Sequence, residues 1–321
     1  MERETNIDIA KGIGIIFVVY GHTFCPFKEY IFLFHMPLFF LLSGLLYNSN
    51  KSTKEYIITK YRSLIVPYGY FIVVLNLVFI IISLIQDKPF YIYPGMLIRP
   101  YGVTLTLWFF LALFNVCVLF RFIDSLNTNY TKLLLIAFLF CTGLIFSNYK
   151  IKLPFYIHSA LTVLVFFAAG FYYKKIKSIK YFCYIISLIV GLYYMYKDRI
   201  PEVNLKENIY SDPSCIFISL CLSFLILDLS SKLYKYKLIQ KILSYLGKKS
   251  LIIFTLHILI LELIYLFLPK NNEVYAVLNT FLAIIITLFI NKILKIEVQI
   301  SYLQCKMDLI FNFIKKNGYR E

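Results

Sequence analysis

Residues 3–44 of the chain read RETNIDIAKGIGIIFVVYGHTFCPFKEYIFLFHMPLFFLLSG. Two apolar runs, at about 7–25 and 30–47, flank a short polar turn, and each approaches the roughly 20 residues that a helix needs to cross a bilayer. Asp8, Lys11, His22 and His35 interrupt these runs. Ionisable groups at membrane depth are costly and usually face the interior of a helix bundle. The stretch therefore predicts a membrane hairpin with a polar, functional interior.

The first run places its ionisable residues on one side of a helix. Lys11 and His22 are eleven residues apart, so they point the same way and lie about 16 Å apart along the axis. Asp8 precedes Lys11 by three residues and shares that face. A second interpretation remains open, in which Asp8 and Lys11 form a pair at the membrane surface and Lys11 extends to the headgroups.

The remaining sequence repeats the apolar pattern from end to end. Of 321 residues, 60% are hydrophobic and only 16% are charged, with a mean hydropathy of +0.75. This composition excludes a soluble protein of this size and leaves no room for a soluble catalytic domain. It predicts an all-α, polytopic membrane protein with about ten transmembrane helices, in which 1–295 form the membrane domain and 296–321 a basic cytoplasmic tail. Beyond the first two, the expected spans are 64–85, 105–123, 132–147, 157–173, 181–197, 214–230, 250–268 and 274–293.

Charge sets the expected orientation. The net charge of +16 comes from bases that cluster between the spans, which topology explains without nucleic acid as a partner. With the N-terminus inside, 23 Lys and Arg fall on the inner side and nine on the outer side. We therefore expect both termini in the cytoplasm and a multi-pass protein of the cell (inner) membrane. No cleavable signal precedes the first span, and the seven cysteines show no paired spacing, so no metal site is expected.

Two histidines are candidates for chemistry. On this topology His22 lies near the outer end of the first span and His35 lies about five residues into the second, so the two can approach each other across the turn. Either they are packing residues or they share a catalytic site. After them, the small pair Ser43-Gly44 allows close contact between helices.

Candidate residues also lie on the inner side. Arg62 and Lys60 precede the third span, and the planar guanidinium of Arg62 suits a phosphate, although a topogenic arginine would look the same. His257 lies about two turns inside the ninth span, either as a packing residue or as part of a polar path near the inner face. Glu262 is about 140° away around that helix, so we do not pair the two.

On the outer side, Trp108 fits an interfacial aromatic belt or a platform for a sugar ring. Asn208 and Tyr210 lie in the polar loop 197–213 and could hydrogen-bond a carbohydrate, but a solvated loop has the same composition. We interpret His158 as an interfacial residue at the outer end of the sixth span.

Five segments together resemble the integral-membrane acyltransferase family 3, which includes bacterial O-acetyltransferases of surface polysaccharides. The first two are closest to the fucose 4-O-acetylase-like branch, and all five occur in the family's order over nearly the whole chain. The segments are NIDIAKGIGIIFVVYGH (6–22), FHMPLFFLLSG (34–44), IVPY (65–68), LWFFLALF (107–114) and LGKKSLIIFTLH (246–257).

The resemblance implies that 1–295 form an acyltransferase domain. It would transfer an acyl group, usually acetyl, from cytoplasmic acetyl-CoA to a hydroxyl of a surface polysaccharide or its lipid-linked precursor, with acyl-CoA as donor substrate and no bound cofactor. Many members have arginine where this chain has Lys11, and their arginine-rich inner motif is reduced here. The family's basic residue and the histidine after it map to Lys11 and His22. Together with the residue-level arguments above, this gives the expected roles: catalysis for His22 and His35, contact with acyl-CoA for Lys11, Lys60 and Arg62, support from Asp8, Ser43 and His257, and acceptor binding for Trp108, Asn208 and Tyr210.

Two other functions use the same features. A polysaccharide or lipid-linked sugar exporter would line its path with these intramembrane charges, although the chain shows no two-fold repeat of the kind many transporters have. A non-catalytic assembly subunit would show no dependence on acyl-CoA.

Overall fold

A computed structural model describes residues 2–85, 98, 102–173, 178–198, 200–270 and 272–317. It is an all-α, polytopic membrane protein, as the sequence predicts, and its only strands in these ranges are a two-residue pair, β1 (Val203–Asn204) and β2 (Ile209–Tyr210). The end of the predicted tail, 318–321, lies outside the described residues.

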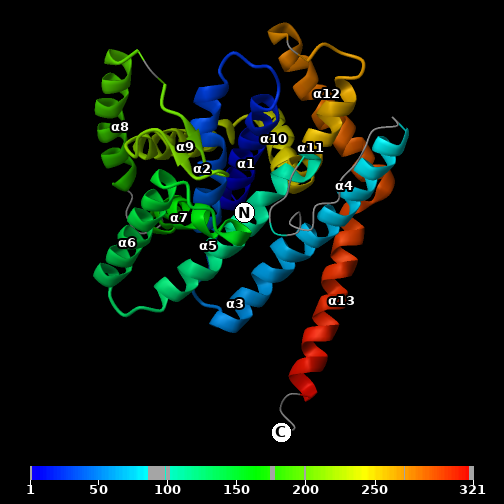
Figure 1. Cartoon of the computed structure of the whole chain (residues 1–321). Coiled ribbons are helices and arrows are strands. Elements are labelled where there is room, and N and C mark those ends of the chain that lie inside the picture. The colour runs from blue at the N-terminus through cyan, green and yellow to red at the C-terminus, as the bar shows by residue number, and fades with distance from the viewer. Residues whose placement is uncertain are drawn as a thin grey trace.

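Figure 1 shows how the helices are arranged. The first half of the chain forms α1 (Glu2–Gly21), α2 (Lys28–Leu45), α3 (Thr53–Lys60), the π-helical turn η1 (Tyr61–Ile65), α4 (Val66–Ile85), the 3-10 turn η3 (Gly102–Leu107), α5 (Trp108–Asp124) and α6 (Asn129–Asn148). The second half forms the 3-10 turn η4 (Pro154–Tyr156), α7 (Ile157–Tyr173), α8 (Ile179–Tyr196), α9 (Cys215–Leu233), α10 (Lys237–Lys248), α11 (Ser250–Ile264), α12 (Glu273–Leu294) and α13 (Ile296–Asn317).

Each of the ten expected spans coincides with a helix. In the described ranges, seven helical stretches are long and apolar enough to cross a bilayer, and they include α2, α5, α6, α7, α9, α12 and the continuous run of α3, η1 and α4. The other three expected spans correspond to α1, whose first half is charged, and to the less extensive apolar stretches of α8 and α11.

Helix α1 lies at the centre of the bundle and contacts α2, α9, α10, α11 and α12. Glycines make the closest approaches possible. A methyl group added to Gly12 would overlap the backbone carbonyl of Leu243 on α10, and one added to Gly247 of α10 would overlap the carbonyl of Asp8. Gly44 of α2 and Gly170 of α7 form a second pair of this kind, which agrees with the close contact expected at Ser43-Gly44.

The segment 231–249, which lies between two of the expected spans and outside both of them, contains a helix. In α10, the apolar residues Leu238, Ile239, Ile242, Leu243 and Leu246 recur with helical spacing, while lysines occupy the other face. The helical period of these apolar residues was not recognised in the sequence, because so many lysines lie among them. The helix brings Gly247 against α1 and so belongs to the packed bundle.

Pro67 lies inside a continuous helical run from Thr53 to Ile85, and not in its first turn. Proline has no N–H to donate to the carbonyl of Ser63, and the turn immediately before it widens to the π-helical register of η1. This turn carries Arg62.

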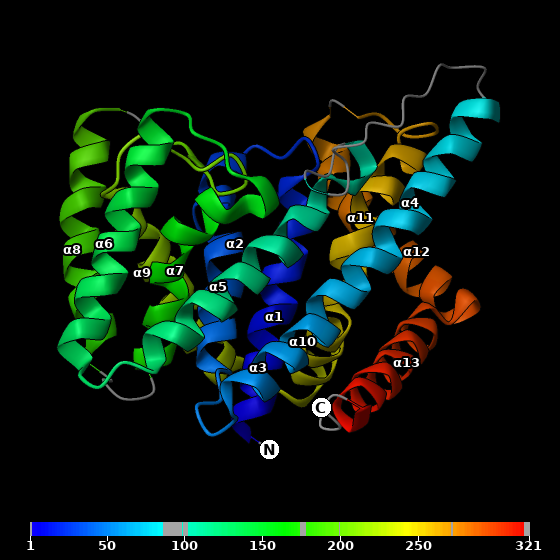
Figure 2. The same cartoon turned by 60° about the horizontal axis from the view of Figure 1, so that its bottom comes forward.

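The first turns of α1 and the last turns of α13 lie at the same end of the bundle, together with α3 and α10 (Figure 2). The short connections between α1 and α2 and between α11 and α12 lie at the opposite end. The helical conformation is interrupted at Lys295, between α12 and α13. We call this point the break at Lys295, and the φ of the residue is 49°, in the left-handed region. Beyond that break α13 packs on α4 and η1.

Candidate active site

Three helices bring three histidine rings together. His22 follows the last residue of α1, His35 lies in α2 and His257 lies in α11. The ring centroid of His22 is 6.4 Å from that of His35 and 4.9 Å from that of His257. The structure therefore shows the approach of His22 and His35 across the turn. It also places His257 beside His22 and so deeper in the bundle than a position near the inner face.

The three rings are held in the same way. Nδ1 of His22 lies 2.8 Å from the carbonyl oxygen of Val18, and Nδ1 of His35 lies 2.8 Å from that of Ile31. Nδ1 of His257 lies 2.8 Å from the carbonyl oxygen of Phe254. A carbonyl oxygen only accepts hydrogen bonds, so Nδ1 carries the proton, and in the neutral ring Nε2 keeps a lone pair. Each ring can thus act as a base or a nucleophile through Nε2.

A cavity of about 130 Å³ adjoins two of these rings. Its walls come from four separate parts of the chain, and His257 lies behind His22, outside the lining. Such a space admits a reacting group, with aromatic walls and a few polar atoms around it. The lining residues are His22, Phe32, His35 and Met36, then Leu105, Thr106 and Trp108, then Val203, Asn204, Leu205 and Lys206, and Phe254.

Trp108 is a wall of this cavity. Its side chain is only 7% exposed and its ring lies 6.4 Å from Phe40 and 6.0 Å from Tyr156. A residue of an interfacial belt faces lipid headgroups, so this burial argues against the belt interpretation and leaves the indole available to a group in the cavity.

The outer loop contributes through different residues from those expected. Asn204 and Lys206 line the cavity, whereas Asn208 and Tyr210 do not appear among its walls. The side-chain amide of Asn208 donates to the carbonyl of Gly143 at 2.9 Å and its oxygen accepts from Thr162 at 2.7 Å. These bonds favour a structural role for Asn208, as the anchor of the loop on α6 and α7.

Ion pairs hold the same loop. Glu207 contacts Lys152, and its other oxygen lies 3.0 Å from Nζ of Lys206. Burial alone would raise the pKa of Glu207, but the hydrogen bonds from Lys152 and Lys206 outweigh it and lower the pKa to about 2. Glu207 is therefore ionised at neutral pH and ties the cavity residue Lys206 to the α6–α7 connection.

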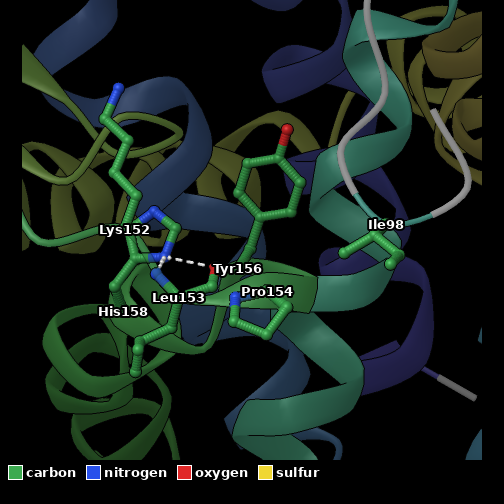
Figure 3. Close-up of a pocket in the computed structure, with 6 residues that line it drawn as sticks. All are labelled: Ile98, Lys152, Leu153, Pro154, Tyr156 and His158. Atoms are coloured by element: carbon green, nitrogen blue, oxygen red, sulfur yellow. Dashed lines mark hydrogen bonds between the residues drawn. The ribbon is translucent and has the colours of Figure 1, made fainter. Parts of the chain in front are cut away.

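The fourth histidine lies in a neighbouring pocket of about 120 Å³ (Figure 3). His158 was expected at the interface but is 2% exposed, with Nδ1 turned to the backbone of Leu153 at 3.1 Å. Its ring contacts Tyr156, which in turn contacts Trp108. His158 is thus separate from the group of three histidines.

The expected acyl-CoA contacts lie toward the other end of the bundle. Lys11 pairs with Asp8 at 3.5 Å, as the spacing predicts, and Nζ of Lys60 lies 5.5 Å from the ring centre of Tyr56. Arg62 pairs with Asp308 of α13. Arg62 is therefore held by the C-terminal helix in this structure.

The hydroxyl of Ser43 forms its hydrogen bond within its own helix, α2. Its Oγ donates to the carbonyl of Phe39 at 2.8 Å, so its contribution visible here is to the helix that carries His35. The close contact of α2 with α7 is made by its neighbour Gly44.

Some cavity residues were not found from the sequence. Phe32 and Phe254 each precede a histidine by three residues on its helix, so helical spacing could have indicated them. Thr106 and Lys206 come from a 3-10 turn and a distant loop, and nothing in their local sequence connects them with the histidines.

The comparison with family models decides the class of this protein. The model described as an acyltransferase domain matches residues 4–292, which include the three clustered histidines and every wall of the cavity. The chain belongs to acyltransferase family 3. No curated protein and no solved structure gives a significant match to it. The acyltransferase match ends three residues before the break at Lys295, so α13 lies outside it.

Proposed function

We propose that this acyltransferase moves an acyl group, most simply acetyl, from cytoplasmic acyl-CoA to a hydroxyl of a cell-surface carbohydrate. The observation that carries the proposal is the group of three histidines, each with its Nδ1 hydrogen-bonded to a backbone carbonyl. Two of these histidines, His22 and His35, line a cavity together with Trp108. The acceptor would enter beside Asn204 and Lys206.

A base is what this reaction needs. A sugar hydroxyl is a poor nucleophile at neutral pH until a base removes its proton. Nε2 of His22 would take that proton while the hydroxyl oxygen attacks the thioester carbonyl. As the carbon–sulfur bond breaks, the proton would pass to the CoA thiolate, which leaves as the thiol. If His22 instead accepts the acyl group first, the Nε2 lone pair attacks the thioester carbonyl and the CoA thiolate leaves. The sugar hydroxyl then attacks the acyl-imidazole, which releases His22, and the hydroxyl proton passes to the thiolate.

The other candidate residues would support this step in two ways, by positioning His22 and by binding the donor. His35 and His257 flank the ring of His22 and would orient it or share the proton. Lys11, Lys60 and Arg62 supply the cations that the phosphates of CoA require, and Asp8 would orient Lys11. About 16 Å along α1 separates Lys11 from His22, so the donor would reach from the basic end toward the histidines.

The test is acyl transfer from radiolabelled acetyl-CoA to cell-envelope carbohydrate in membranes that contain the full-length protein. His22→Ala should lower the rate by about 10²- to 10⁴-fold, the usual contribution of a general base. His158→Gln is the matched control, because His158 is a buried histidine that does not line the cavity, and it should retain the wild-type rate.

Two results would contradict the proposal. One is a stably inserted His22→Ala protein with wild-type transfer. The other is a deletion strain that loses the polymer itself, since an exporter is needed for the polymer whereas an acyltransferase is needed only for its modification.

A further inference from the structure

A second and larger cavity, of about 470 Å³, lies where α10 and α11 meet the break between α12 and α13. It lies at the end of α11 that is opposite the outer loops. Its lining residue Lys249 precedes His257 by eight residues, which is about 12 Å along a helix. Lys249, Lys292 and Lys295 line it together with Tyr245, Phe289 and Val298. The proposed acyl transfer does not use these residues.

The cavity carries an excess of positive charge. Among the described residues that line it, Glu297 is the one carboxylate, and it pairs with Lys249. Lys292 and Lys295 form no ion pair within the part of the chain that the structure describes. Lys295 also holds a left-handed φ of 49°, an uncommon conformation for a residue with a side chain, at the point where α12 ends. Two ammonium groups are thus available to an anion.

The approach to the cavity is apolar. Phe281, Ile285, Phe289 and Ile293 recur every four residues along α12 and are 54–61% exposed, so one face of α12 is directed outward. On a helix of a membrane protein, such a face lies against lipid chains. This apolar face leads directly to the cavity, because Phe289 belongs to both.

We propose that this cavity binds an anionic phospholipid, with the headgroup phosphate at Lys292 and Lys295 and the acyl chains along the apolar face of α12. A basic pocket between helix ends at the membrane surface is the usual form of such a site. A soluble phosphate ligand would use the lysines but not the apolar face. The lipid would stabilise the junction of α12 and α13, and through α13 the contact of Asp308 with Arg62.

The experiment measures thermal unfolding of the purified full-length protein in detergent with added phosphatidylglycerol, phosphatidylcholine or coenzyme A. Phosphatidylglycerol should raise the unfolding midpoint by several degrees, and the other two should not. The double variant Lys292→Gln/Lys295→Gln should lose most of this shift. The control Lys235→Gln/Lys237→Gln removes the same charge from exposed lysines outside the cavity and should keep it.

A second variant distinguishes loss of lipid binding from a folding defect. Lys292→Arg/Lys295→Arg retains both charges and should keep the shift, and native mass spectrometry should find phosphatidylglycerol retained in preference to phosphatidylcholine on the wild type. Equal loss in the Lys235/Lys237 control would overturn the proposal. So would a midpoint shift with coenzyme A alone, or equal retention of the two lipids.

Discussion

The three clustered imidazole rings show how single residues gain orientation inside a helix bundle. Each Nδ1 hydrogen bonds to a carbonyl three or four residues earlier on its own helix or helix end. No partner from elsewhere in the chain is needed to fix the ring. Nε2 of His257 is buried and has no hydrogen-bond partner among the described residues.

Glu207 is the residue through which pH should act on the outer loop. Its folded pKa of about 2 lies below the ordinary value of 4.5. Its contribution to stability is therefore present above pH 4.5 and is lost as the pH falls through 4.5 toward 2. We expect Glu207→Gln to lower the free energy of unfolding by about 1–3 kcal/mol at pH 7, with a difference from wild type that shrinks below pH 4.5.

Thermal unfolding in detergent between pH 3 and 7, followed by circular dichroism, measures this difference. Glu262→Gln is the control, since Glu262 pairs with Lys270 at 3.1 Å but is about half exposed. Its effect should stay within about 1 kcal/mol. A Glu207→Gln variant with no greater effect than Glu262→Gln at pH 7 would contradict the expected role of the loop ion pairs.

Among the elements, the contact of α1 with α10 depends on two glycines. Gly12 and Gly247 each face the backbone of the other helix, and a backbone cannot move aside as a side chain can. We expect Gly247→Ala to destabilise the protein by about 1–3 kcal/mol through overpacking. Gly69 of α4 has nothing within 4 Å of an added methyl group, so Gly69→Ala should be neutral or stabilise by up to about 1 kcal/mol.

The same unfolding assay compares the two glycine variants. Opposite signs are expected although the substitution is identical, because only Gly247 lies against a neighbouring helix. If both variants shift the midpoint alike, helix propensity rather than close packing governs the contact.

The existence of the ten apolar helices was predictable because long apolar runs leave few alternatives in a membrane, whereas the basic helix α10 was not predicted. The pairing of Asp8 with Lys11 and the approach of His22 to His35 were predictable too, since they depend only on helical spacing and one short turn. The contact of His257 with His22 was not, because it depends on how α11 packs on α1 across more than 200 residues of sequence. The pairing of Arg62 with Asp308 likewise depends on the direction that α13 takes after Lys295.

At the scale of the whole molecule, the cavity with the histidines and the bases near the termini lie toward opposite ends of the bundle. The start of α1 and the end of α13 share one end with α3 and α10, and the short connection that carries His22 lies at the other (Figure 2). The proposed acyl transfer would require this separation, because it takes the acyl group from a cytoplasmic donor to an acceptor at the cell surface. The proposed function therefore depends on the orientation of the bundle.

The excess of bases at the end that carries the termini predicts that this end is cytoplasmic. Labelling of introduced cysteines in a Cys141→Ser/Cys305→Ser background, which removes the two exposed thiols, tests it. Glu202→Cys, in the outer loop, should react with a membrane-impermeant maleimide in intact cells. Ser125→Cys, an exposed residue just after α5, should react only after permeabilisation. The reverse pattern would place the histidine cavity on the cytoplasmic side, where acyl-CoA and acceptor would have to meet without crossing the bilayer.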